Sequence, residues 1–113
     1  MKKIVFLVLI MLAGLNVQAQ QKKDKNAKYD IEVKGNCEQC KKRIEKAAFN
    51  VKGVKMATWN EDEQLLHLTV DENKCSAEDV RNAVAKSGHD TDKAKAVKED
   101  YNKLPMCCQY KRS

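Results

Sequence analysis

The sequence has little arginine and few aromatic residues. It contains three arginines and one tryptophan in 113 residues, and aromatic residues make up 5% of the chain. The formal net charge of +6 therefore comes mainly from lysines, without an arginine-rich patch or stacking side chains among them. Proteins that bind nucleic acids usually combine basic charge with such groups. We expect no nucleic-acid partner, and we interpret the lysines as a solvated surface that favours an acidic docking partner.

Catalytic constellations and internal repeats are also absent from the sequence. No arrangement typical of hydrolases or nucleases is visible, and no tract of low complexity interrupts the chain. We therefore expect a binding protein and not an enzyme.

The chain also lacks an apolar run long enough to span a membrane. Its longest run covers residues 4–15, which is shorter than the ~20 residues of a spanning helix. Two lysines precede this run, and Val17-Gln18-Ala19 closes it, as in a secretory signal peptide. We predict a signal peptide at residues 1–19 and export to the periplasm of a Gram-negative cell. No cysteine lies near the cleavage point, so lipid attachment is not expected.

Apolar periodicity predicts a mixed chain of strands and helices. Residues 20–28 are polar and lysine-rich, which indicates a flexible leader. The expected elements are a strand over 29–35, a helix over 40–51, a hairpin of strands at 54–59 and 65–70, and a helix over 76–88. Ser76 and Asp79 resemble a capping box at the start of that second helix.

The last quarter of the chain is charged and rich in alanine and lysine. Apolar residues at helical spacing over 91–104 predict a short extra helix, which Pro105 ends. Residues 106–110 then predict a final short strand along the edge of the sheet.

Five cysteines remain after the predicted cleavage, namely Cys37, Cys40, Cys75, Cys107 and Cys108. An odd number excludes a complete set of disulfides within the chain, so at least one thiol is free, metal-bound or paired with another chain. Cys37 and Cys40 stand at the junction of the first strand and helix. Such a pair suits either a soft metal ion or a disulfide cycle. The positive end of the helix, with Lys41, Lys42 and Arg43, favours the thiolate form.

The order of elements around this C-x-x-C resembles the heavy-metal-associated domain family. That family includes copper chaperones, amino-terminal domains of P-type ATPases and periplasmic mercury-binding proteins. The matching features are C-x-x-C followed by K-K-R-I-E-K-A, Gly53-Val54, Leu66/Leu68/Val70 with Asp71, and Gly88-His89-Asp90. They cover residues 29–90.

The resemblance implies an α+β, ferredoxin-like βαββαβ sandwich. In this fold a four-stranded antiparallel sheet carries two helices on one face, and here the extra short helix would precede the last strand. We assign residues 29–113 to one heavy-metal-associated domain with a C-terminal extension. The family usually has methionine where Gly35 stands, and that methionine packs under the metal loop. We expect the absence of this methionine to affect the rigidity of the loop and the choice of metal ion more than metal binding itself.

Cys107 and Cys108 are a second departure from the family pattern. In a βαββαβ fold the loop after the first strand and the loop after the second helix lie at the same end, so we expect Cys107 or Cys108 near the C-x-x-C. Adjacent residues in a strand point to opposite faces, so only one of the two should face it. Ordinary edge-strand cysteines, or a strained disulfide between the two neighbours, remain the alternatives. His89 is a candidate third ligand, a hydrogen-bond partner of a ligand, or a solvated histidine at a helix end. Cys75 is expected to be structural.

The resulting hypothesis is an exported soft-metal carrier that captures Cu(I) through Cys37 and Cys40. It would pass the ion by ligand exchange to a membrane metal transporter or to another metal carrier. Hg(II), Cd(II) and Zn(II) remain alternative ions, although Zn(II) would need about four ligands. A thiol-disulfide oxidoreductase is the alternative from another class. Two copies bridged by one metal ion also stay open.

Overall fold

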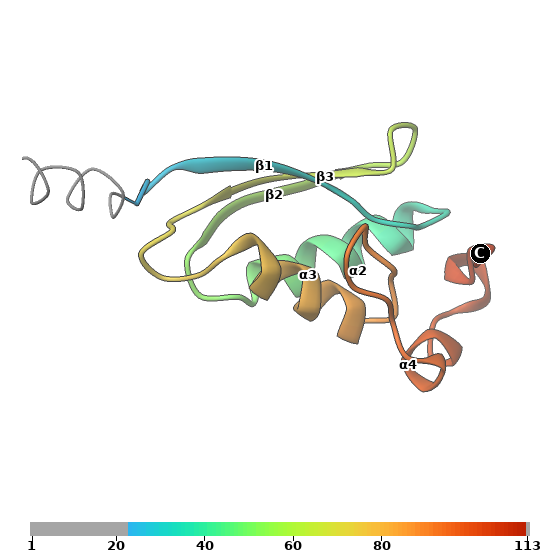
Figure 1. The fold of residues 1–113 in the computed structure, drawn as a ribbon. Helices are drawn as coiled ribbons and strands as arrows, with labels where there is room; N and C mark the ends of the chain where they lie inside the picture. The colour runs from blue at the N-terminus through green and yellow to red at the C-terminus, as the bar shows by residue number, and fades with distance from the viewer. Residues whose placement is uncertain (1–22, 113) are drawn as a thin grey trace, which may run out of the picture.

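The computed structural model describes residues 23–112, which form an α+β fold with one antiparallel sheet. The elements in chain order are β1 (Ala27–Glu32), α2 (Glu38–Phe49), β2 (Val54–Asn60), β3 (Leu65–Val70), α3 (Ala77–Lys86), α4 (Lys98–Asn102) and the 3-10 helix η1 (Met106–Cys108). Figure 1 shows the sheet as one layer, with α2 and α3 together on one of its faces. The predicted signal peptide lies outside the described residues. Within them, no helix has both the length and the apolar character needed to cross a membrane.

The sheet has the strand order β1-β3-β2, so β3 is the central strand. Alternation along β3 buries Leu66, Leu68 and Val70. In the register of the sheet, Leu66 pairs with Ile31 of β1 and with Trp59 of β2. Because side chains alternate between the faces of a strand, this register directs one apolar set toward the helices. The core therefore lies between the sheet and the helix layer.

Both long helices pack an apolar stripe against this sheet. In α2 the buried positions are Cys40, Ile44 and Ala48, four residues apart, so they share one face. In α3, Ser76 accepts a hydrogen bond from the Asp79 amide, and the Asp79 carboxylate accepts one from the Ser76 amide. The predicted capping box is confirmed. Caps of this kind contribute about 1 kcal/mol to a helix.

The first strand begins earlier than the sequence indicated. Ala27 is buried and pairs with Val70, two residues before the predicted start at Tyr29. Backbone hydrogen bonding extends further back, because the Glu72 amide donates to the Asp24 carbonyl at 2.9 Å. The last part of the segment predicted as a flexible leader is therefore joined to the sheet.

The C-terminal part differs from the prediction in one element. Helix α4 confirms the short extra helix, but the final strand expected at 106–110 is not confirmed. Cys108 N–H donates to the Pro105 carbonyl, and Gln109 N–H donates to the Met106 carbonyl. These local bonds satisfy the backbone as a 3-10 turn, so it does not pair with the sheet. Among residues 23–112 the sheet has three strands, with one isolated antiparallel bridge between Val33 and Thr91.

Candidate metal centre

Four cysteine sulfurs gather at the end of the domain where β1 leads into α2. The Sγ atom of Cys37 lies 3.4 Å from that of Cys40, 3.0 Å from that of Cys107 and 3.5 Å from that of Cys108. The sulfurs of Cys37, Cys40 and Cys108 all lie within 4.8 Å of one another. Thiolates are the ligands that soft metal ions prefer. The cluster is therefore chemically suited to hold such an ion.

The start of α2 positions the C-x-x-C pair. Cys37 is the N-cap residue, with an extended backbone, and Cys40 occupies the third position of the helix. Unpaired amides at a helix N-terminus and the helix dipole both favour negative charge at these positions. The Asn36 amide donates to the Cys40 sulfur at 3.3 Å. Cys40 is fully buried, whereas Cys37 is partly exposed, so one sulfur is anchored and the other is accessible.

The 3-10 helix η1 brings the second cysteine pair to the same place. The sequence predicted that Cys107 or Cys108 would approach the C-x-x-C, and that only one of them would face it. Both sulfurs lie within 3.5 Å of the Cys37 sulfur. The alternation rule did not apply, because a 3-10 turn, unlike a strand, does not direct neighbouring side chains to opposite faces. Cys108 is buried and Cys107 is exposed.

The neighbouring thiols change the acidity of Cys37. Burial tends to raise the pKa of its thiol, but hydrogen bonds with Cys107, with Cys40 and with Cys108 lower that pKa to about 7. A substantial fraction of Cys37 is therefore thiolate near neutral pH. The hydrogen bond with Cys37 raises the pKa of Cys107. Burial, followed by hydrogen bonds with Cys40 and Cys37, raises the pKa of Cys108.

Two of the basic residues after the C-x-x-C contact groups other than the cysteine sulfurs. Lys41 pairs with Glu45 and donates to the Trp59 carbonyl at 3.2 Å, and Arg43 contacts the Ser87 carbonyl. The largest influences that lower the Cys37 pKa are hydrogen bonds from other cysteines and not these cations. Lys41 thus connects α2 to β2, and the hydrogen bonds that lower the Cys37 pKa come from the neighbouring thiols and from the Cys40 backbone amide.

Trp59 packs against the loop over residues 33–37, which we call the cysteine loop. It is 1% exposed, and its indole N–H donates to the Val33 carbonyl at 3.0 Å. A β-carbon placed on Gly35 would lie 3.0 Å from the Trp59 ring and 3.0 Å from the β-carbon of Cys40. A side chain therefore has little room at position 35. Trp59 occupies the space under the loop, which accounts for glycine at position 35.

A network of polar and aromatic contacts holds the C-terminal segment against the rest of the domain. The Tyr110 hydroxyl accepts from the Asp90 amide at 2.8 Å and donates to the Gly88 carbonyl at 2.9 Å. Arg112 forms a bidentate ion pair with the Asp90 carboxylate, in which Nε and Nη2 donate to the two carboxylate oxygens at 3.0 and 2.8 Å. We call residues 105–112 the C-terminal arm, and these contacts attach it next to the sulfur cluster.

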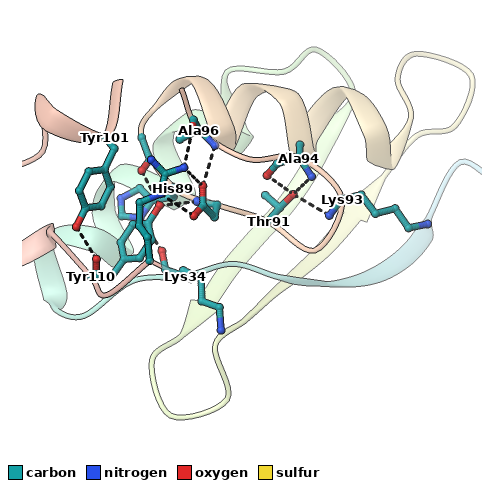
Figure 2. A network of polar contacts seen from close by, with 11 residues as sticks. Lys34, His89, Thr91, Lys93, Ala94, Ala96, Tyr101 and Tyr110 are labelled. Atoms are coloured by element: carbon teal, nitrogen blue, oxygen red, sulfur yellow. Dashed lines mark hydrogen bonds and ion pairs between the residues drawn. The ribbon is translucent and has the colours of Figure 1, made fainter. Parts of the chain in front are cut away.

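His89 belongs to this network and is not part of the sulfur cluster. Its ring is fully buried and stacks on Tyr110, with 5.6 Å between ring centroids, and its Nδ1 lies 2.7 Å from the Lys34 carbonyl (Figure 2). Burial lowers the pKa of His89, so the neutral ring donates through Nδ1–H. Nε2 has no hydrogen-bond partner among the described residues. His89 is not in the group of ligand atoms that lie within 4.8 Å of one another.

His67 and Cys75 lie away from the cluster. His67 is on the outer face of the sheet, where Asp30 and Glu63 contact its two ring nitrogens. The pKa of His67 is raised by its hydrogen bonds with these two carboxylates. Cys75 is buried, and its sulfur lies close to the backbone of Gly53. Burial raises the pKa of Cys75, in keeping with a structural role.

Comparison with known proteins gave matches among solved structures alone. No protein-family model matches the sequence, and no curated protein matches it.

The similar solved structures include several that are named for copper. A structure described as the CopZ metallochaperone is 26% identical, covers 57% of this chain and 98% of its own, and has a TM-score of 0.56. The N-terminal domain of a potential copper-translocating P-type ATPase from Bacillus subtilis, in the Cu(I)-loaded state, is 27% identical. It covers 58% of this chain and 84% of its own, also with a TM-score of 0.56. Oxidized MerP from Ralstonia metallidurans CH34 is 24% identical and has a TM-score of 0.56. It covers 58% of this chain and 93% of its own, and it supports the fold alone.

Fold and site together define the class of this protein. The described chain is a ferredoxin-like α+β domain whose C-x-x-C stands at the entrance to its first helix. It resembles the heavy-metal-associated domain family, both in the arrangement of its elements and in the position of Cys37 and Cys40.

Proposed function

We propose that this protein is a non-enzymatic carrier that captures Cu(I) through Cys37 and Cys40 outside the cytoplasm and passes it to a membrane transporter or another carrier. One observation carries the proposal: the sulfurs of Cys37, Cys40 and Cys108 lie within 4.8 Å of one another at one end of the fold. The similarity to a metallochaperone and to a Cu(I)-loaded transporter domain supports the choice of ion.

The exposure of the two cysteines suits a transfer step. Cys40 is buried and lies in α2, so it holds the ion in place, whereas Cys37 is accessible to an incoming ligand. In the transfer, a thiolate of the partner forms a bond to the ion while the bond to Cys37 breaks. The freed Cys37 thiolate takes up a proton, and the partner's thiol has released one. No redox change is required.

Thiol-disulfide exchange is the second candidate, and one observation favours it. The Cys37 pKa of about 7 is comparable to that of the attacking cysteine of disulfide oxidoreductases. Hg(II) and Cd(II) remain alternative cargo at the same sulfurs, because they share the preference of Cu(I) for thiolate.

A competition titration tests the proposal. The reduced protein is titrated anaerobically with Cu(I), Hg(II), Cd(II) and Zn(II) against chelators of known affinity. We expect Cu(I) to bind tightly to the wild type. Replacing both Cys37 and Cys40 with serine should weaken that binding by more than about 100-fold. Loss of a residue that only hydrogen-bonds a metal ligand lowers affinity by up to about 100-fold, so loss of the ligands themselves should exceed it.

The matched control for this titration is Cys75→Ser, which removes a buried cysteine away from the cluster. It should retain the wild-type affinity. Equal affinity of the wild type and the Cys37→Ser/Cys40→Ser protein would refute the assignment. Rapid reduction of insulin disulfides without metal retention would favour the oxidoreductase.

Export predicts which residue is the first of the mature protein. When the full chain is expressed in a Gram-negative host, we expect the protein in the periplasmic fraction with Gln20 as its first residue, because Val17-Gln18-Ala19 has the small-residue pattern that signal peptidase cleaves. Mass spectrometry of the purified protein measures this. An intact mass that includes residues 1–19, found in the cytoplasmic fraction, would contradict export.

A further inference from the structure

We propose that the bound ion is held by three sulfurs, those of Cys37, Cys40 and Cys108, and that the exposed Cys107 is the sulfur through which the ion enters and leaves. This inference rests on the proposed metal-binding function and specifies its coordination. It assigns a separate role to each cysteine of the C-terminal arm, the segment over residues 105–112.

The spacing of the sulfurs favours three ligands over two. With a metal–sulfur bond of about 2.3 Å, two sulfurs in a linear site are about 4.6 Å apart, and those in a planar three-coordinate site are about 4.0 Å apart. The Cys37 sulfur lies 3.4 Å from that of Cys40 and 3.5 Å from that of Cys108. A three-sulfur site therefore needs small outward shifts, whereas a linear pair would have to separate by more than an ångström and leave the third sulfur beside the ion.

The arm that carries Cys108 is fixed in place. Helix η1 contacts α2, and Tyr110 and Arg112 anchor the following residues to Gly88 and Asp90. Figure 2 shows Tyr110 beside His89 and Tyr101, and the two tyrosine rings meet edge to face with 5.1 Å between their centroids. Cys108 itself is fully buried. Its sulfur is thus held next to the pair before any ion arrives, which reduces the entropy cost of a third bond.

Cys107 lies in a different position from the other three cysteines. Its side chain is exposed, and its sulfur is 3.0 Å from that of Cys37 and 3.9 Å from that of Cys108. Of the four clustered cysteines it is the exposed one, whereas Cys37 is partly exposed and Cys40 and Cys108 are buried. Cys107 therefore reaches the accessible side of the site, while Cys40 and Cys108 close the buried side.

This position allows an exchange within the protein before the transfer, in which Cys107 and not the partner's thiolate displaces Cys37. As Cys107 forms a bond to the ion, it releases its proton to water and the bond to Cys37 breaks. The freed Cys37 thiolate takes a proton from water, so protons and electrons balance. The ion is then bound to an exposed sulfur, from which a partner's thiolate or a chelator displaces it.

Two measurements separate the roles of the two cysteines. X-ray absorption spectroscopy on the Cu(I)-loaded full chain counts the sulfurs bound to the ion. We expect three in the wild type, three in Cys107→Ser and two in Cys108→Ser. Stopped-flow transfer of Cu(I) to an excess of chelator should be slowed about tenfold or more in Cys107→Ser, a barrier increase of about 1.4 kcal/mol.

The controls keep this test separate from the proposed function. Cys75→Ser should match the wild type in both measurements, because its cysteine is remote from the cluster. Where Cys108→Ser is poorly folded by circular dichroism, Cys108→Ala replaces it. Two sulfurs in the wild type, or unchanged transfer in Cys107→Ser, would overturn the inference while leaving the Cys37 and Cys40 carrier intact. Absence of Cu(I) binding by the wild type would instead overturn the proposed function.

Discussion

Replacing Trp59 with alanine is expected to lower the free energy of unfolding by about 3–5 kcal/mol, the range for deleting a large buried aromatic side chain. Trp59 is 1% exposed and packs beneath the cysteine loop, so its removal leaves a cavity next to Gly35 and Cys40. The Val33 carbonyl also loses the indole N–H that donates to it. The loop that carries Cys37 would then lose its support, and metal affinity should fall together with stability.

Urea denaturation, followed by circular dichroism, measures the first effect, and competition titration with Cu(I) measures the second. Phe49→Ala is the matched control, because Phe49 is also aromatic but is 52% exposed at the end of α2. Its replacement should change the free energy of unfolding by only about 0.5 kcal/mol. Similar denaturation midpoints for Trp59→Ala and the wild type would show that the ring does not support the loop.

Most of the fold could be predicted from local sequence patterns. Alternation identified β3, helical spacing identified the buried face of α2, and the residues Ser76 and Asp79 marked the start of α3. Each of these signals lies within one element and depends on the contrast between buried and exposed positions. The contrast is weaker at the end of an element: Phe49, the last residue of α2, is apolar but exposed.

The proximity of the two cysteine pairs was predictable from topology, but their orientation was not. Knowing which loops share an end of the fold placed Cys107 or Cys108 near Cys37. The conformation of 106–108 depends on Pro105 and on local hydrogen bonds, which turn the chain into a 3-10 helix. Sequence periodicity over three residues cannot distinguish such a turn from a short edge strand.

The attachment of the C-terminal arm also had no local signal. Asp90 and Arg112 are 22 residues apart, and so are the Tyr110 hydroxyl and the Gly88 carbonyl that accepts its hydrogen bond. Nothing in the spacing of these residues distinguishes them from ordinary charged and aromatic positions. Buried polar groups need partners, however, and this requirement explains why they meet once the chain is folded.

Replacing Asp90 with alanine should release the C-terminal arm. The Asp90 carboxylate accepts hydrogen bonds from the Ala96 amide at 2.8 Å and from Arg112, and the side chain is largely buried. Its loss leaves the buried Ala96 N–H without an acceptor, at a cost of about 1–3 kcal/mol, and leaves Arg112 with the Ala96 carbonyl as its remaining acceptor. A loss of about 2 kcal/mol in the closed arm raises the population of the open arm roughly 30-fold.

The alkylation rate of individual cysteines in the metal-free, reduced protein measures this release. Cys108 is buried in the closed arm and should react with iodoacetamide roughly 30-fold faster in Asp90→Ala. Cys75, which is buried elsewhere, should stay protected, so the change is an opening of the arm and not a general unfolding. Asp92→Ala is the control, because it removes a carboxylate that pairs with Arg81 outside the arm. If the Asp90 and Asp92 variants label Cys108 at the same rate, the arm is held by contacts other than Asp90, and packing of Tyr110 against His89 would have to position Cys108 by itself.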